Sequence, residues 1–378
     1  MKPSAKPLYP LLCLFLIAFT VWQFAYAIPN PDKSWDYQVY ASATQSFETG
    51  QNPYAEISIP NEPPLYFDYP PHTLYYLWLL DRIAIYHSTT LYYLMLLGLL
   101  LASVYLIVRL DNAPDRLFLY TLTASGFMAA YWNFVNGNSP IIFLFLFAVM
   151  FTLIKKGNLW QSAIVAGFSA TISMFTAPFI ALYFLVRRPI KYRLGYMALS
   201  AGIVGALFLT DHLVNPGLFS SYLTMLRGST SPIYYPGGWN KPAFVLLLRD
   251  ITPDTTQWIV LCSLFAVLVL IALWEYNKNN AGSDQLKTLS ITVIAIFLFL
   301  PYIPPYDYII LVLPIYLLFK DRNAKVKAMV LASITLPEFF VWVTPAFGFV
   351  GSNIPALGYA PVYGLLLVFV VAATSRAP

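Results

Sequence analysis

Charged residues are scarce in this chain. They make up 10% of its 378 residues, whereas hydrophobic residues make up 59%, and the mean hydropathy is +0.65. Soluble domains are about 25% charged, so the composition excludes an ordinary soluble protein. Apolar runs long enough to cross the hydrocarbon core of a membrane recur from end to end. Because no alternating ten-residue pattern accompanies them, they predict an all-α polytopic membrane protein.

Cysteine and histidine are also rare. The two cysteines, Cys13 and Cys262, both lie within apolar segments, so a disulfide framework is not expected. The three histidines, His72, His87 and His212, are scattered, and no cluster of His, Cys and Asp has the spacing of metal ligands. A structural zinc site is therefore not expected. No cofactor is expected.

Basic residues leave a net charge of +5, but they do not form a surface that would bind nucleic acid. They lie in short loops between apolar segments, which is the positive-inside pattern. Lys2 and Lys6 predict a cytoplasmic N-terminus, and Arg376 predicts a cytoplasmic C-terminus. The first apolar segment, Leu8 to Ile28, is longer than the core of a usual signal peptide. We interpret it as a retained helix, with a cleavable signal peptide as the alternative.

The charge pattern predicts a single integral-membrane domain over residues 1–378, with about 10–13 transmembrane helices. Two structured external loops are expected, at about residues 29–90 and 211–256, because both contain clusters of Pro and Gly. Within the first loop, Thr73 to His87 is expected to lie on the membrane surface as an interfacial helix. The later spans are expected at approximately 91–108, 117–134, 140–154, 158–173, 178–186, 194–210, 257–275, 288–302, 306–319, 328–345 and 355–374.

One carboxylate follows the first apolar segment among aromatic residues, in Trp35-Asp36-Tyr37. The first ionisable groups after a span lie where water, lipid headgroups and protein meet. A carboxylate there can act as a general base and remove the proton from a hydroxyl that accepts a sugar. The other interpretation is that Asp36 caps a helix beginning at Tyr37, since Asp is a favoured N-cap residue.

Sugar transfer from a lipid phosphate also needs positive charge or hydrogen-bond donors for the departing phosphate. The candidate cations on the external side are Lys33, Arg82, Arg227, Lys241 and Arg249. Lys241 and Arg249 are favoured because they are eight residues apart, about two turns of a helix, and so could face one cleft. The alternative is that these side chains reach out to lipid headgroups.

Further candidates for substrate binding carry an aromatic ring, an amide or a carboxylate: Tyr37, Tyr40, Tyr54, Tyr69, Asn138, Asn240, Tyr306 and Asp307. The tyrosines could stack on sugar rings or belong to an interfacial belt. The asparagines could bond sugar hydroxyls or form turns. Asp307 could orient sugar hydroxyls or bond a helix end, and a carboxylate near hydrocarbon usually has a reason. Lys320 to Lys327 is interpreted as a topological signal only.

Several short motifs occur in a recognisable order. They are Asp36-Tyr37-x-x-Tyr40, Gly50-Gln51-Asn52-Pro53-Tyr54, Phe67-Asp68-Tyr69-Pro70-Pro71, Asn136-Gly137-Asn138-Ser139, Trp239-Asn240-Lys241-Pro242 with Arg249, and Pro305-Tyr306-Asp307-Tyr308. This order resembles glycosyltransferase family 87, a family of membrane GT-C enzymes. The family opens with an Asp-containing segment, a Gly-x-x-Pro-Tyr turn and a Tyr-Pro-Pro. Its later segments are Gly-Gln-x-Asn, Asn-Gln-Ser…Arg and Ser-Pro-x-x-Trp-x-His.

The resemblance implies a GT-C-like bundle that transfers a hexose, most often mannose, from a polyprenyl phosphate. The acceptor would be a lipid-linked or cell-surface glycan at the outer face of the plasma or inner membrane. The partners implied are therefore a polyprenyl-phosphate sugar, a glycan or glycolipid acceptor and membrane lipids. The resemblance also implies that Asp36 is the base, that the anomeric carbon is inverted and that no metal is required.

The chain departs from the family pattern at two places. The family often has a Lys in the span before Pro178, where this chain has Met174-Phe175-Thr176-Ala177. The late His of the family is absent, and Tyr306-Asp307-Tyr308 occupies its region.

These departures keep two alternatives open, a catalytically degenerate GT-C scaffold and a lipid or polysaccharide transporter. Broken helices and buried polar groups would suit a transporter equally well, although many transporters contain internal repeats and this chain shows none.

Overall fold

The computed structural model describes residues 8–27, 34–58, 65–83, 88–111, 114–229, 244–252, 254–279, 284–300, 303–343 and 359–374. Within these ranges the regular structure is helical, apart from one isolated bridge between Ile57 and Leu65. The prediction of an all-α fold is therefore confirmed. The described residues cluster into two compact units, and the prediction of a single domain stays a prediction.

Unit 1 comprises Met1–Tyr26, Ile107–Tyr131 and Gly237–Pro378. Its α-helices are α1 (Leu8–Ala27), α5 (Arg116–Ser125), α11 (Phe244–Ile251), α12 (Thr255–Asn279), α13 (Gln285–Phe299), α14 (Val312–Phe319), α15 (Ala324–Val343) and α16 (Ala360–Thr374). Two 3₁₀ helices, Gly126–Met128 and Pro305–Leu311, belong to the same unit.

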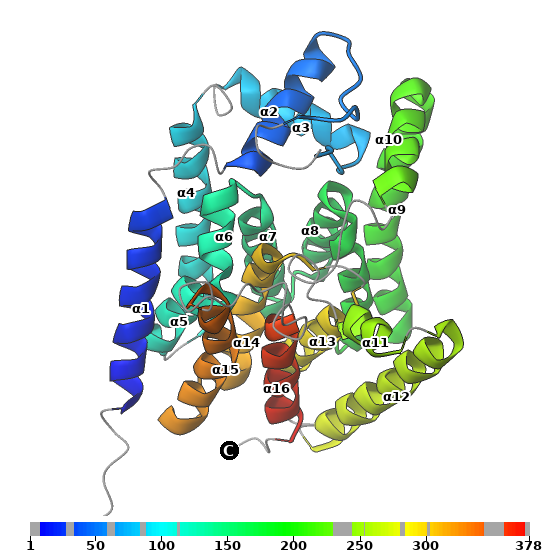
Figure 1. Ribbon diagram of the computed structural model, residues 1–378. Coiled ribbons are helices and arrows are strands. Elements are labelled where there is room, and N and C mark those ends of the chain that lie inside the picture. Colours follow the sequence, from blue (N-terminus) through cyan, green and yellow to red (C-terminus); the bar gives the residue numbers. More distant parts are fainter. Residues whose placement is uncertain are drawn as a thin grey trace, which may run out of the picture. The chain divides into compact units, whose positions relative to one another are not determined.

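Unit 2 comprises Ala27–Leu106 and Trp132–Pro236. Its α-helices are α2 (Trp35–Glu48), α3 (Pro71–Arg82), α4 (Thr89–Arg109), α7 (Pro140–Lys155), α8 (Leu159–Ile172), α9 (Ile190–Val214) and α10 (Pro216–Ser229). A 3₁₀ helix covers Met174–Leu185. α6 (Ala129–Asn136) runs from unit 1 into unit 2, and the last residues of α4, from Ile107, belong to unit 1. Figure 1 shows α2 and α3 side by side at one end of unit 2.

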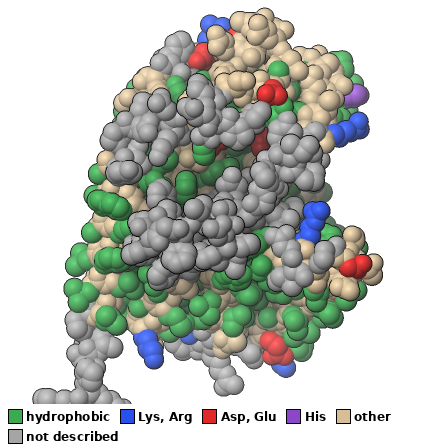
Figure 2. Space-filling view, in the orientation of Figure 1, with side chains coloured by type: hydrophobic (Ala, Val, Ile, Leu, Met, Phe, Trp, Pro, Cys, Tyr) green, Lys and Arg blue, Asp and Glu red, His purple; other side chains and the backbone are tan. Residues whose placement is uncertain are grey.

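Four helices of the described ranges are long and apolar enough to cross a membrane: Leu8–Ala25, Thr89–Arg109, Ile190–Val214 and Thr255–Lys278. Their outward faces are apolar; on α12, for example, Leu264, Leu268 and Leu270 are all more than half exposed. Figure 2 shows hydrophobic side chains spread widely over the molecular surface. Because water does not favour such faces, they indicate contact with lipid. The chain is thus an integral membrane protein, as predicted.

The predicted span 117–134 is broken in the structure. α5 ends at Ser125, and Phe127 and Met128 have positive φ angles of 52° and 49°. Tertiary packing holds this unfavourable backbone, because the buried ring of Phe127 packs 4.5 Å from that of Tyr308. Hydropathy alone could not reveal the break, since no proline marks it.

Both predicted external loops contain more helix than expected. α2 and α3 lie in the first, and α10 and α11 lie in the second. The predicted interfacial helix from Thr73 begins earlier, because Pro71 occupies the first turn of α3, where its missing N–H is tolerated. The described part of α3 ends at Arg82.

The lysines after α14 do more than report topology. Lys320 Nζ lies 3.0 Å from Asp111 Oδ1, and Lys327 forms an ion pair with Asp115. Asp115 also caps α5, because its side chain accepts from the backbone N–H of Phe118. The interpretation of Lys320 to Lys327 as a topological signal alone is therefore wrong; these residues connect α14 and α15 to the start of α5.

Candidate functional site

Asp36 lies in the first turn of α2, in unit 2. Ser34 occupies the N-cap position, so the interpretation of Asp36 as the helix cap is wrong. The side-chain amide of Asn138 instead donates a 2.8 Å hydrogen bond to Asp36 Oδ2. The indole of Trp35 also bonds the carboxylate. These two donors hold the carboxylate of Asp36, and the residue is half-buried.

Tyr40 follows Asp36 by one helical turn, so the two side chains lie on the same face of α2. The Tyr40 hydroxyl donates to Asn138 Oδ1 at 3.0 Å. It also lies 3.2 Å from the Tyr69 hydroxyl, which is 2.8 Å from Ser139 Oγ. Tyr40, Tyr69 and Ser139 form a group that we name the hydroxyl cluster. Asn138 connects this cluster to Asp36, because its amide bonds both.

The loop between α6 and α7 presents Asn138. Asn138 N–H donates to the carbonyl of Asn133 at 2.9 Å, and Ser139 N–H donates to Asn138 Oδ1 at 2.7 Å. Gly137 adopts a φ of +69° beside the first turn of α2. Its carbonyl accepts a 3.0 Å bond from the Tyr92 hydroxyl on α4. This turn therefore fixes the amide that holds Asp36.

Replacing Gly137 by alanine is expected to impair both folding and activity. A Cβ at Gly137 would lie 2.7 Å from the Cβ of Tyr37, a contact that forces α2 away from the turn. The positive φ adds about 1–2 kcal/mol for any residue with a Cβ. Gly50→Ala is the matched control, because Gly50 has a φ of +71° but nothing within 4 Å of its Cβ position. The unfolding temperature and the turnover should both fall clearly further in Gly137→Ala than in Gly50→Ala. Equal losses in the two variants would contradict this account.

The other predicted tyrosines of unit 2, Tyr54 and Tyr37, contact residues that surround the site. The Tyr54 hydroxyl donates to the backbone carbonyl of Tyr69 at 3.0 Å, which fixes the segment before α3. The ring of Tyr37 packs 5.2 Å from that of Tyr92. The rings of Tyr37 and Tyr54 are both buried, so neither offers an open face for a sugar. Their predicted role in stacking on substrate stays a prediction.

A buried ion pair anchors α3 to α8 and α9. His72 Nδ1 lies 2.6 Å from Asp211 Oδ2, and His72 Nε2 lies 2.7 Å from the carbonyl oxygen of Thr171. Both side chains are about one-twentieth exposed. A carbonyl only accepts, so Nε2 carries a proton and donates it. The sequence did not predict this pair, because no sequence pattern relates two residues that are 139 positions apart.

The electrostatics of Asp36 favour a base that titrates close to neutral pH. Burial raises the pKa of Asp36 to about 8, and the negative charge of Asp68 adds to the rise. The hydrogen bonds from Trp35 and Asn138 oppose it. A carboxyl group whose pKa lies near the working pH is well matched to proton transfer.

The remaining predicted site residues belong to unit 1 or are outside the described residues. Asn240 and Lys241 are outside the described residues. Arg249 is exposed on α11 of unit 1. Tyr306 and Asp307 lie in the 3₁₀ helix Pro305–Leu311 of unit 1, where Asp307 is buried. The structure thus brings together the predicted residues of unit 2, and the part played by the others stays a prediction.

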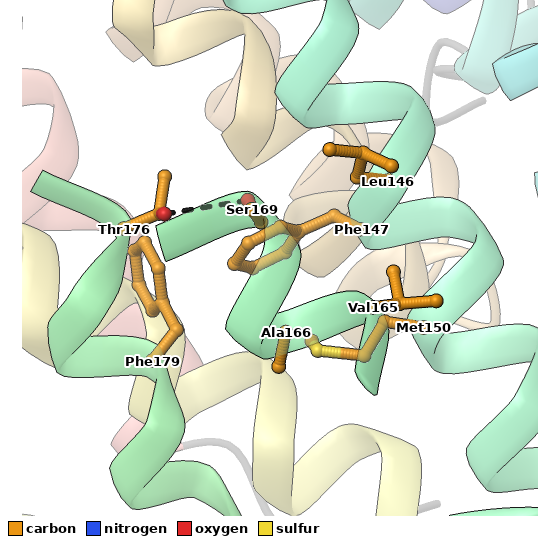
Figure 3. Close-up of a pocket in the computed structure, with 8 residues that line it drawn as sticks. All are labelled: Leu146, Phe147, Met150, Val165, Ala166, Ser169, Thr176 and Phe179. Atoms are coloured by element: carbon orange, nitrogen blue, oxygen red, sulfur yellow. Dashed lines mark hydrogen bonds between the residues drawn. The ribbon is translucent and has the colours of Figure 1, made fainter. Parts of the chain in front are cut away.

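Two further observations concern a small pocket and the possible metal ligands of the described residues. Figure 3 shows a small pocket between α7, α8 and the 3₁₀ helix Met174–Leu185, with Phe147 and Phe179 in its walls. Its volume of about 10 Å³ has room for one water molecule at most. Among the described residues, no group of three or more His, Cys, Asp or Glu side chains could hold a metal ion.

Comparison with known proteins assigns the chain to a family. No curated protein and no solved structure gave a match. The model of Glycosyltransferase family 87 matches residues 66–301, a range that includes Tyr69 and Asn138 but begins after Asp36. The matched range is more than half of the 378 residues. The chain therefore belongs to glycosyltransferase family 87 and is a membrane glycosyltransferase.

Proposed function

We propose that this enzyme transfers a hexose, with mannose favoured, from a polyprenyl-phosphate donor to a glycan or glycolipid hydroxyl on the external face of the membrane. Asp36 is the general base. The observation that carries the proposal is the setting of Asp36: a half-buried carboxyl with a pKa near 8, held by Asn138 beside the hydroxyl cluster. No cation of the described residues is among the groups that shift this pKa.

The reaction balances with this one base. The acceptor oxygen attacks the anomeric carbon from the face opposite the phosphate, and Asp36 takes the proton of that hydroxyl. The bond between the anomeric carbon and the phosphate oxygen breaks, and its electron pair leaves with the phosphate. The configuration at the anomeric carbon is inverted. The leaving phosphate is already an anion and needs no proton, so a second acid is not required.

The unit 2 residues have distinct roles in this scheme. Asn138 positions Asp36, since its amide donates to the carboxylate and accepts from Tyr40. The hydroxyl cluster offers both donors and acceptors to an incoming sugar. On the donor side, Lys241 and Arg249 remain our candidates for the phosphate, with Asn240, Tyr306 and Asp307 for the sugar. The scheme routes no step through a metal or another cofactor.

A transfer assay tests the proposal. Purified protein in lipid nanodiscs is given polyprenyl-phosphate [¹⁴C]mannose and lipids extracted from the host membrane, and the products are separated from the donor. Label should enter a new product, and the polyprenyl phosphate should be released in equal amount. Passage of the intact donor across liposome membranes, with no new product, would instead support a transporter. Donor that is neither consumed nor moved would support a scaffold.

A further inference from the structure

Unit 2 contains a second, much larger cavity of about 300 Å³. Its walls come from α2, α3, α4, α7 and α8 and are mostly hydrocarbon, as with Leu77 and Leu80 on α3, Met95 and Leu99 on α4, and Phe168 and Ile172 on α8. This volume is at the lower end of the range for ligand pockets, which are typically apolar with a few placed polar groups.

The polar groups of this cavity include those of the proposed site. Tyr40, Tyr69 and Ser139, which are the hydroxyl cluster, all line it. The Tyr40 hydroxyl bonds Asn138, and Asn138 bonds Asp36. One side chain therefore separates the cavity wall from the carboxylate that we propose as the base. A molecule in the cavity would have its polar end directed at the site of proton transfer.

Charge indicates which substrate the cavity accepts. None of the described residues that line it is charged. A donor phosphate placed at the hydroxyl cluster would find no cation among the described residues of the wall and would lie near the carboxylate of Asp36. An acceptor hydroxyl placed there would lie near the base that it needs. The cavity therefore suits the acceptor rather than the donor.

A buried hydroxyl in the same wall also lacks a partner. Thr73 is 4% exposed, and its Oγ1 forms no hydrogen bond with any described residue. Buried polar groups are nearly always hydrogen-bonded. This oxygen is itself buried in the wall, so a bound molecule would bond it only after the Thr73 side chain turns toward the cavity.

We propose that this cavity binds the hydrocarbon chain of a lipid-linked acceptor, with the acceptor's sugar at the hydroxyl cluster. The proposal rests on the proposed function and narrows it, because the acceptor is then a glycolipid rather than a polysaccharide without a lipid. The hydrocarbon chain of the acceptor lies among α3, α4 and α8, and its reacting hydroxyl lies beside Asp36.

Photo-labelling measures occupancy without requiring transfer. The probe is dodecyl α-mannoside with a diazirine near the end of its alkyl chain, applied to the purified protein in nanodiscs. Labelled peptides should map to α3, α4 and α8. Leu99→Trp, which fills the cavity, should lower labelling at these peptides at least fivefold. Leu101→Trp on the same helix is the matched control, because Leu101 is 61% exposed, and it should change labelling less than twofold.

A second cavity-filling variant and a competition experiment complete the photo-labelling test. If Leu99→Trp does not fold, Leu80→Trp fills the cavity from α3 and is expected to give the same loss. Excess unlabelled dodecyl mannoside should protect the three helices from labelling, whereas polyprenyl phosphate should not. Protection by polyprenyl phosphate alone would assign the cavity to the donor and overturn the proposal. Equal labelling in Leu99→Trp and Leu101→Trp would show that the probe contacts only the lipid-facing surface.

Chain length provides the kinetic test. With alkyl mannosides of increasing length as acceptors, kcat/KM should rise by up to about fourfold for each methylene group that the cavity buries. The rise should be flattened by Leu99→Trp and kept by Leu101→Trp. Transfer that is independent of chain length would overturn this inference and leave the proposed function intact. Labelling of the cavity without any transfer would overturn the proposed function and leave the lipid site intact.

Discussion

Asp36→Asn is expected to lower turnover by about 10²–10⁴-fold, the range that general base catalysis contributes. Asparagine keeps the shape of the side chain and can still accept the hydrogen bond from Asn138, but it cannot take a proton. The protein should therefore fold and bind its substrates normally, and KM should change little. Single-turnover transfer of labelled sugar measures the loss at the chemical step.

The pH profile identifies the group responsible. The active form of a base is the ionised one, so kcat/KM of the native enzyme should rise about tenfold per pH unit up to the pKa of Asp36, near 8, and then level off. The residual activity of Asp36→Asn should lack this rise. Glu48→Gln is the matched control, because Glu48 lies at the far end of the same helix. Its profile should be native; a profile of native shape in Asp36→Asn would show that another group titrates.

The same pKa gives a stability prediction of known sign. The folded pKa of Asp36, about 8, lies above its unfolded value near 4. The folded state therefore binds this proton more tightly than the unfolded state. The stability that this proton contributes is lost as the pH rises from about 4 through about 8. Asp36→Asn removes the burial of a charge, so at pH 8 the variant should unfold at a temperature no lower than that of the native protein.

The core of the site could be predicted where local rules apply. Asp36 and Tyr40 are four residues apart, and that spacing alone puts them on one face of a helix. Asn138 follows a glycine between two apolar segments, which predicts a turn that presents its side chain. The bond between Asn138 and Asp36 could not be predicted, because 102 residues separate them and only tertiary packing brings them together.

Other parts of the fold had no local signal. Ser139 completes the hydroxyl cluster, yet a serine before a helix has ordinary explanations as a cap. The break at Phe127 lies in an apolar segment that hydropathy predicts as one span. The lysines at Lys320 and Lys327 match the positive-inside pattern, and that pattern hides their ion pairs with Asp111 and Asp115. In each case packing between distant segments decides the outcome.

His72→Ala is expected to lower the free energy of unfolding by about 3–5 kcal/mol, the usual effect of removing one partner from a buried ion pair. The loss leaves Asp211 and the carbonyl of Thr171 without the donors that His72 supplies. It also releases α3 from α8 and α9. Tyr69 lies in the segment that leads into α3, three residues before His72. The hydroxyl cluster should therefore loosen and turnover should fall, although no catalytic group is changed.

His212→Ala is the matched control for this prediction. His212 is the next residue after Asp211 but is exposed, so its removal should change stability by no more than about 0.5 kcal/mol. Replacing both partners, as His72→Phe with Asp211→Leu, removes the unpaired charge and should recover much of the stability lost in either single variant. Thermal unfolding in detergent measures the native protein and each of these variants. If His72→Ala were no less stable than His212→Ala, the pair would not be what holds α3 to α8 and α9, and the support of the hydroxyl cluster would have to come from Tyr54 and its bond to the Tyr69 carbonyl.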